Sequence, residues 1–113
     1  MFEFHGWASI NYHTHDTDPQ KQDECWDSLK CHVDTYEHSS LIFMHRYNGC
    51  DSLMIGGQHN HRQEYVFKLF QWIAEHAPGS YGLLYLLDDE DNQHENEFQV
   101  WRLCQGTLKE MPD

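Results

Sequence analysis

The chain has 113 residues, with 19 acidic residues against 7 lysines and arginines and a formal net charge of −12. This length fits one domain with its own hydrophobic core, and no apolar run approaches the roughly 20 residues that a membrane span requires. An aromatic content of 14% argues against disorder, and the net charge excludes nucleic acid and anionic membranes as direct partners while favouring basic proteins.

The first residues and the cysteines bear on the cellular compartment. Met1-Phe-Glu-Phe-His5 is acidic and alternating, unlike a signal peptide. The four cysteines show no C-x-x-C pair, and a chain of this length needs no disulfide or metal to fold. We therefore expect a cytoplasmic protein with reduced thiols.

Residues 1–12 alternate between apolar and polar side chains, which predicts a half-buried first strand. The small Gly6 lies on its apolar face and would let a helix pack closely. After a polar loop, Asp18 and Pro19 supply an N-cap acid and a proline at the first helical position. Apolar residues then recur at helical spacing, which predicts a helix over residues 19–36.

A hairpin follows the first predicted helix. Residues 41–47 are rich in β-branched and aromatic side chains and are predicted as a strand. Asn48-Gly49 is a strong signal for a tight turn, since both residues tolerate positive φ. The chain returns over residues 51–55 as a third strand, which we expect to end at Gly56-Gly57.

A second helix and two further strands come next. Asn60 is a good N-cap and Gln63 is placed for a capping box, so a helix is expected over residues 61–76. Residues 81–87 carry apolar side chains on both alternating faces, which is typical of a central strand covered on both sides. Residues 98–104 alternate like a partner strand.

The predicted order is βαββαββ, with the tail over residues 105–113 expected to form a turn. This order favours an α+β fold, a two-layer sandwich with both helices on one face of the sheet. We expect about five strands in a mainly antiparallel sheet.

The most acidic stretch follows the predicted strand at 81–87. Six of the 19 acids fall within residues 88–97, with no lysine or arginine among them. They are Asp88, Asp89, Glu90, Asp91, Glu95 and Glu97. Their mutual repulsion is tolerated only where water or a partner compensates it, so we predict a binding surface for a basic partner; an ordinary solvated hairpin loop is the alternative. Asp88 and Asp89 lie nearest the core and are the best candidates for structural roles.

Trp7 shares its strand face with polar residues, which predicts a position on the sheet surface away from the helices. Together with Tyr85 it would anchor a protein interface, because aromatic side chains dominate binding hot spots. The alternative for a sheet face this aromatic is that the C-terminal tail covers it.

Three stretches of the sequence carry a resemblance to a known family. They are Glu3-Phe-His-Gly-Trp7, Gly57-Gln-His-Asn-His-Arg62 and Tyr81-Gly-Leu-Leu-Tyr-Leu-Leu-Asp-Asp-Glu-Asp91. In this order they resemble the immunity protein 7 family, whose members neutralise polymorphic bacterial toxins. The resemblance implies that residues 1–113 form a single immunity-protein domain, in a family whose members often continue with a further tail.

The resemblance also implies a non-enzymatic inhibitor without a cofactor, which binds one cognate toxin domain in the cytoplasm of the producing bacterium. We expect a monomer that forms a one-to-one heterodimer with its toxin. Composition adds an argument of its own, because a nuclease presents a basic cleft to polyphosphate and an acidic domain can occupy that cleft. The expected partner is therefore a basic toxin domain with nuclease activity.

Histidines and acids keep other classes of function open. His13 and His15 lie two residues apart, as do His59 and His61, and the four could hold zinc or copper if their loops meet. The acids from Asp88 onward could bind Mg²⁺ weakly, although they lack the spacing of an EF-hand loop. A metal-binding protein or a small metal-dependent hydrolase is thus the alternative to immunity, and a plain acidic adaptor or DNA mimic is a third.

Overall fold

The computed structural model describes residues 1–94 and 97–112. Within them the chain forms two α-helices, α1 (Pro19–Val33) and α2 (Tyr65–His76), and a short 3-10 helix, η1 (Ser39–Leu41). The strands are β1 (Phe2–Ser9), β2 (Ile42–Tyr47), β3 (Cys50–His59), β4 (Tyr81–Asp88), β5 (Gln99–Cys104) and β6 (Thr107–Glu110).

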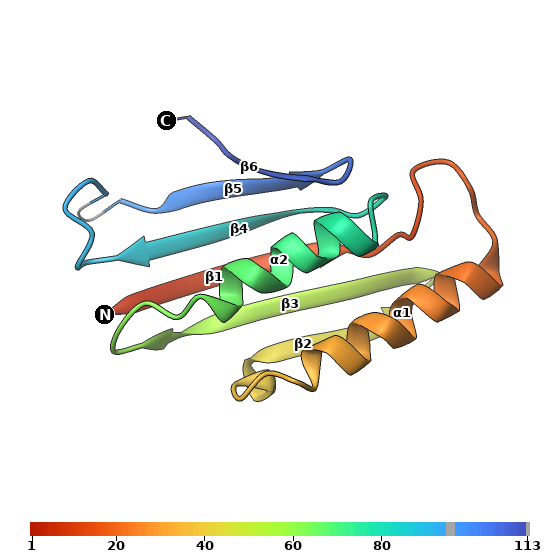
Figure 1. Cartoon of the computed structure of the whole chain (residues 1–113), viewed down its shortest axis with the longest axis horizontal. Helices are drawn as coiled ribbons and strands as arrows, with labels where there is room; N and C mark the ends of the chain where they lie inside the picture. Colours follow the sequence, from red (N-terminus) through yellow and green to blue (C-terminus); the bar gives the residue numbers. More distant parts are fainter. Residues whose placement is uncertain (95–96, 113) are drawn as a thin grey trace.

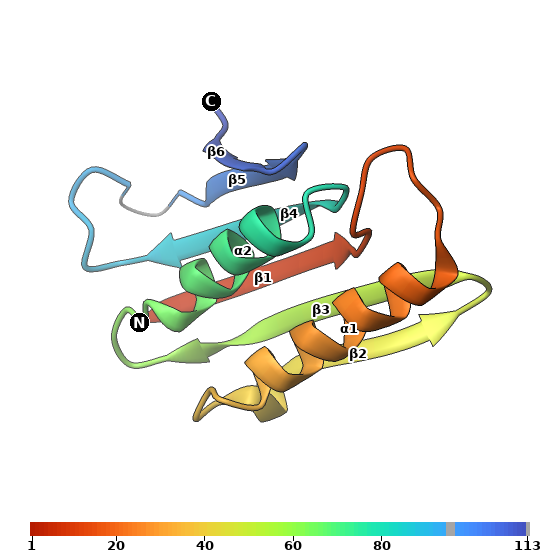
Figure 2. The ribbon, with the colours of Figure 1, turned by 45° about the vertical axis from the view of Figure 1, so that its right-hand side comes forward.

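All six of these strands join one antiparallel sheet in the order β2-β3-β1-β4-β5-β6. Both helices lie on the same side of this sheet, with α2 over its middle and α1 over β2 and β3 (Figures 1 and 2). The predicted α+β fold with both helices on one face is confirmed. The first strand of the chain occupies the middle of the sheet.

The sheet has one strand more than the five predicted, because the tail forms β6 instead of a simple turn. Gln105 and Gly106 adopt φ angles of 49° and 76° and reverse the chain, so that Leu108 pairs with Leu103. The sequence signal is weak here, since glutamine is not a preferred residue of such turns. Leu108 packs against the hydrophobic core, which holds this short strand at the sheet edge.

The helix α1 begins where the sequence predicts and ends earlier. The carboxylate of Asp18 accepts hydrogen bonds from two backbone amides of the first turn, and Pro19 is the first helical residue. The helix stops at Val33 instead of residue 36. The amides of Thr35 and Tyr36 bond to carbonyls three residues back, which closes a turn and ends the helix.

The helix α2 starts later than predicted because β3 is longer. The strand does not stop at Gly56-Gly57 but continues to His59 and pairs with the first residues of β1. The chain then needs several residues to pass from the sheet to the helix layer. Glu64 takes the N-cap position, so the capping box predicted for Asn60 and Gln63 does not begin this helix.

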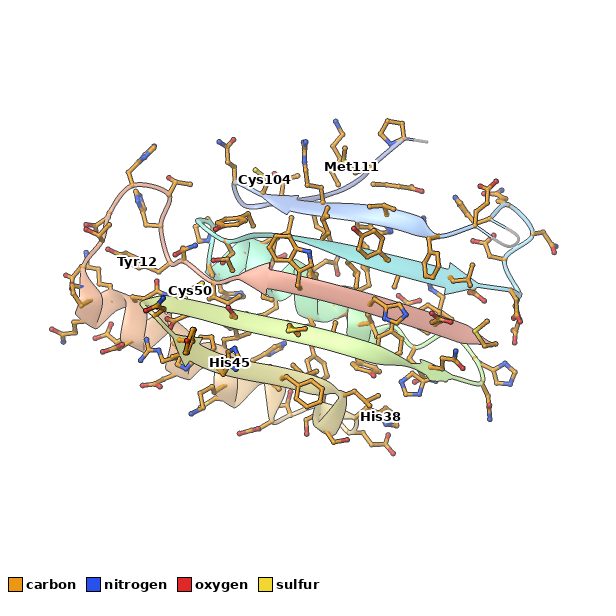
Figure 3. The ribbon with its side chains drawn as sticks, turned by 180° about the vertical axis from the view of Figure 1, so that it is seen from behind. Tyr12, His38, His45, Cys50, Cys104 and Met111 are labelled. Carbon is orange, nitrogen blue, oxygen red and sulfur yellow. The ribbon has the colours of Figure 1, made fainter. Side chains whose placement is uncertain are left out.

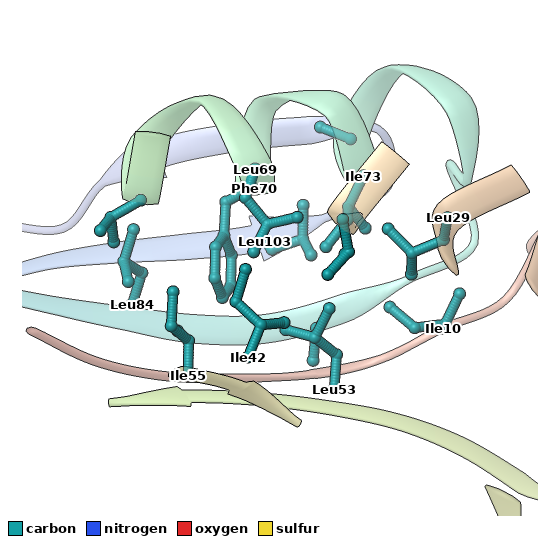
Figure 4. Close-up of a cluster of buried hydrophobic side chains, with 14 of the residues drawn as sticks. Ile10, Leu29, Ile42, Leu53, Ile55, Leu69, Phe70, Ile73, Leu84 and Leu103 are labelled. Carbon is teal, nitrogen blue, oxygen red and sulfur yellow. The ribbon is translucent and has the colours of Figure 1, made fainter. Parts of the chain in front are cut away.

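The core lies between the two helices and the side of the sheet that faces them (Figure 4). Phe4, Leu53, Phe70 and Leu84 have no exposed surface. A Cβ atom added to Gly6 would approach the Phe70 ring within 2.9 Å. Glycine at this position therefore lets α2 pack closely on β1, as predicted.

The opposite side of the sheet has no helix over it in the described residues (Figure 3). Along β4 the side chains alternate in burial, and Tyr81 on the helix-free side is 51% exposed. The prediction that residues 81–87 are covered on both sides is therefore wrong. The strand is interior because β1 and β5 pair with its two edges, not because a second layer covers it.

Candidate functional site

The open face, meaning the side of the sheet without helices, carries a row of apolar side chains across its middle. Phe43, Met54, Trp7 and Leu83 lie opposite one another on β2, β3, β1 and β4. Phe43 is 64% exposed, Met54 57% and Trp7 41%. The Trp7 ring meets Tyr81 edge to face, with 6.1 Å between the ring centroids. The structure thus places Trp7 on the surface away from the helices, as predicted.

A depression of about 380 Å³ lies beside this row. The side chains of Trp7, Phe43, Met54 and Tyr85 are among those that line it, together with Gly56. A Cβ atom added to Gly56 would meet no atom closer than 3.7 Å. The missing side chain at this position therefore leaves the depression open.

The aromatic surface continues from the depression toward the acidic residues. Phe98 lies 6.5 Å from the ring of Tyr85 and 6.2 Å from that of His5, between ring centroids. It is 43% exposed, and its neighbour Glu97 is exposed as well. Of the predicted binding residues, Trp7 and Tyr85 therefore line one depression, and Phe98 connects that depression to Glu97.

The described part of the C-terminal tail does not cover this face. Residues 107–110 extend the sheet beside β5, and the amide of Met111 donates to the carbonyl of Val100 at 2.8 Å. Figure 3 shows Met111 beyond the outer edge of β5. The alternative that the tail shields the aromatic face is wrong for the residues that the structure describes.

Two of the predicted acids make contacts within the chain. The side chain of Asp88 is only 11% exposed, accepts from the amide of Glu90 at 3.1 Å and lies 3.9 Å from Nη1 of Arg62. Asp89 accepts a hydrogen bond of 2.7 Å from the ammonium group of Met1, and this bond raises the pKa of that group. The acids nearest the core thus have the local partners that a structural role requires.

The next two acids have histidine partners. Glu90 lies 2.6 Å from Nδ1 of His61, and Asp91 lies 3.0 Å from Nδ1 of His94. A hydrogen bond from the amide of Gln93 and the contact with His94 hold the pKa of Asp91 below its usual value. The same contact raises the pKa of His94. Histidine side chains thus lie within hydrogen-bonding distance of two of the acids.

The loop still presents carboxylates to solvent at one end of the sheet. The side chains of Asp89 and Glu90 are 47% and 55% exposed, and Glu97 is exposed beside Phe98. The sixth predicted acid, Glu95, lies outside the described residues. We call the acids from Asp88 to Asp91 together with Glu97 the acidic loop. This loop and the apolar depression adjoin on one surface.

The two histidine pairs lie at opposite ends of the sheet. The loop with His13 and His15 follows the last residue of β1, whereas His59 pairs with Phe2 at the start of the same strand. Nδ1 of His13 accepts from the amide of His15 at 3.0 Å, and Nε2 of His59 bonds to the hydroxyl of Tyr65 at 2.8 Å. The predicted condition for a four-histidine site, that the loops meet, is not fulfilled.

Among the residues that the structure describes, no three His, Cys, Asp or Glu side chains gather as metal ligands would. A polar hollow of about 500 Å³ at the end of the sheet is lined by Tyr12, Asp16, Gln22 and Asp51 among others. Gln22 donates to Asp51 at 2.8 Å and to the carbonyl of Ile10 at 2.8 Å. These bonds connect α1 to the sheet. The polar residues around the hollow therefore have a structural role.

Among the residues that line the depression, sequence reasoning missed Phe43, Met54 and Gly56, and also His5. A usable signal was present in the hairpin. A two-residue turn at Asn48-Gly49 fixes the register of its strands, and that register sets Phe43 opposite Met54. Placing both on the open face required one more fact, namely which side of the sheet the helices cover.

Within the described residues, neither helix combines the length and the apolar character that crossing a membrane requires. A family model described as immunity protein 7 matches residues 1–113. No curated protein matches the sequence, and no solved structure matches the fold. The match spans the whole chain, including the open face and the acidic loop. The chain therefore belongs to the immunity protein 7 family, which indicates an immunity protein that acts against a toxin.

Proposed function

We propose that this protein binds and neutralises one cognate toxin domain, a nuclease, in the cytoplasm of the cell that makes both. The observation that carries the proposal is the family match over residues 1–113. The protein acts as a single domain, is a monomer before it meets the toxin and forms a one-to-one complex with it. It blocks the toxin by occupying its surface, without catalysis or a cofactor of its own.

The charge of the chain supports a basic nuclease as the target. A formal net charge of −12 repels polyphosphate and attracts a protein that has evolved to hold it. Complementary charge raises association rate constants to as much as about 10⁸ to 10⁹ M⁻¹s⁻¹ at low salt. Rapid capture suits an inhibitor that has to reach a lethal enzyme before the enzyme reaches nucleic acid.

The proposed contact surface joins the acidic loop to the open face. Charged contacts come from the loop and apolar contacts from the strands. The contact residues are Asp88, Asp89, Glu90, Asp91, Glu95, Glu97, Trp7 and Tyr85. Asp88 is the least exposed of the described acids in this set, so we assign it the smallest share of direct contact and the largest share in shaping the loop.

Co-expression tests the proposal. The C-terminal domain of the protein encoded immediately upstream is expressed in bacteria with and without this chain, and growth, copurification and the integrity of cellular DNA and RNA are scored. We expect toxicity with degraded nucleic acid when the domain is expressed alone, and normal growth with a stable complex when both are present.

A nuclease toxin from an unrelated gene pair serves as the control, and this chain should not rescue cells from it. Toxicity without rescue or binding would reject immunity against the upstream domain. Rescue with intact nucleic acid in the unprotected cells would keep immunity and reject a nuclease as the target.

A further inference from the structure

We propose that the depression beside Trp7 is the anchoring site for the toxin and receives one protruding apolar side chain from it. The two parts of the surface then have different roles. The acidic loop sets the rate of association, and the depression sets the lifetime of the complex. The inference rests on the proposed function, because it names the part of this surface that holds the toxin once the two have met.

The first argument is the exposure of apolar surface at fixed positions. Phe43, Met54 and Trp7 are 64%, 57% and 41% exposed and lie on three neighbouring strands. Apolar patches of this kind on a soluble protein mark interaction sites. Because paired strands hold these side chains in place, little backbone ordering is required when a partner binds.

The second argument is the shape of the site. Gly56 lines the depression and has open space where a side chain would stand, with the nearest atom 3.7 Å from an added Cβ. His5 lines the same depression, and its Nε2 lies 2.6 Å from a carboxylate oxygen of Glu3, which holds the ring in place. The depression has a volume of about 380 Å³ and is open to solvent, so a large side chain can enter it.

The third argument identifies the occupant by charge. A second copy of this chain would bring another net charge of −12 against the first, and the two would repel each other. A basic protein seated on the depression is instead attracted. The surface through Tyr85 and Phe98 leads directly to the exposed Glu97, so one partner can fill the depression and meet the acids together.

The two parts of the surface differ in the kinetic step that they affect. Charges at an interface rim act mainly on association and on its salt dependence, whereas buried anchors act on dissociation. The depression has mainly apolar side chains around it, and the loop has exposed carboxylates. Substitutions in the depression should therefore change the dissociation rate constant and leave the salt dependence of association unchanged.

Biolayer interferometry with the full chain and the purified toxin domain encoded upstream tests this inference. Gly56→Val places a branched side chain in the depression without removing any side-chain contact, and Trp7→Gln removes the largest side chain that lines it. We expect each variant to raise the dissociation rate constant by about 30-fold or more, as for a binding hot spot. Tyr47→Ser, which removes a 74% exposed aromatic from another part of β2, should change it by less than about twofold.

Thermal unfolding of each variant shows whether the fold is intact, and Trp7→Gln carries the test should Gly56→Val fail to fold. Unchanged dissociation in a folded depression variant would overturn the inference while leaving immunity in place. Failure of the unsubstituted chain to bind the toxin would overturn the proposed function and this inference with it. Self-association of the free chain that Trp7→Gln abolishes would overturn it in favour of a second copy as the occupant.

Discussion

The two faces of the sheet are built from the same strands, and both carry large apolar side chains. These side chains are buried on one face and exposed on the other. On the covered face Phe4, Leu53 and Leu84 are fully buried, whereas on the open face Met54 and Trp7 remain 57% and 41% exposed. The difference comes from the position of the two helices and not from the local sequence. Apolar residues on the first face stabilise the fold, and those on the second are available for a partner.

The largest expected difference between the faces is the effect of removing one phenylalanine from each. Phe4→Ala removes a fully buried ring from the covered face and should lower the free energy of unfolding by about 3–5 kcal/mol. Phe43→Ala removes a 64% exposed ring and should change it by less than about 0.5 kcal/mol. Urea unfolding measures both. Similar losses for the two variants would show that the open face also supports the fold.

Two glycines sharpen the comparison. An added Cβ at Gly6 would lie 2.9 Å from the Phe70 ring and 3.0 Å from Leu84, so Gly6→Ala should cost about 1–3 kcal/mol of stability. At Gly56 the nearest atom is 3.7 Å away, and Gly56→Ala should stay within about 0.5 kcal/mol. Urea unfolding compares the pair. A large loss at Gly56 would mean that the open face is tightly packed after all.

Removing four acids from the acidic loop should affect toxin binding more than removing four acids from the helix side of the molecule. Asp89→Asn, Glu90→Gln, Asp91→Asn and Glu97→Gln together remove four charges from the acidic loop. We expect the association rate constant with the toxin to fall about tenfold at low salt, with a flatter salt dependence.

The matched variant removes four charges from α1 and the turn after it, through Glu24→Gln, Asp27→Asn, Asp34→Asn and Glu37→Gln. Since these acids lie on the helix side, the association rate constant should fall less than about threefold, through the lower net charge alone. Equal effects of the two variants would show that steering depends on total charge and not on the loop.

The smallest expected effect is a pH dependence of stability on the covered side. His32 stacks on Trp72 with 4.7 Å between ring centroids, and His59 bonds to Tyr65. Burial lowers the pKa of both histidines below 6.5. The unfolded chain then binds protons more readily than the fold, so stability is complete above pH 6.5 and falls as the pH drops toward the folded-state pKa values.

Urea unfolding above and below pH 6.5 measures this change. The double variant His32→Gln and His59→Gln should show a smaller loss on acidification than the original chain. Asn92→Ala, which removes no titratable group, serves as the control. His94 works in the opposite direction, because its pKa is raised by Asp91 and its contribution is present below pH 6.5 and lost as the pH rises. A stability that rises on acidification would show that His94 outweighs His32 and His59 together.

Local signals predicted the elements that depend on neighbours in sequence. The N-cap at Asp18 and the turn at Asn48-Gly49 are present as predicted. Asp18 accepts hydrogen bonds from nearby backbone amides, and Asn48 and Gly49 tolerate the positive φ angles of the turn. The capping box at Asn60 failed because β3 continued past its glycines to pair with β1, which is a long-range contact. The strand β6 was missed because its only apolar anchor is Leu108.

The candidate site was also predictable only where local sequence signals determine the position of a side chain. Alternation placed Trp7 correctly, and the position of Asp88 next to the strand pointed to its limited exposure. Alternation alone does not tell which face of a strand receives a helix, so residues 81–87 were wrongly expected to be covered on both sides, whereas Tyr85 lines the open depression. The partners of the acids, such as Met1 and His61, come from distant parts of the chain and gave no sequence signal.

Because β1 lies in the middle of the sheet, its pairing determines when the newly synthesised protein can fold and bind the toxin. The strand leaves the ribosome before its two neighbours, which are residues 50–59 and 81–88. The middle of the sheet therefore cannot close until most of the chain has been translated, and such non-local pairing is slow to form. We expect nascent chains arrested before β4 emerges to remain protease-sensitive. Resistance to the toxin then depends on completed chains, and their supply has to precede that of the toxin.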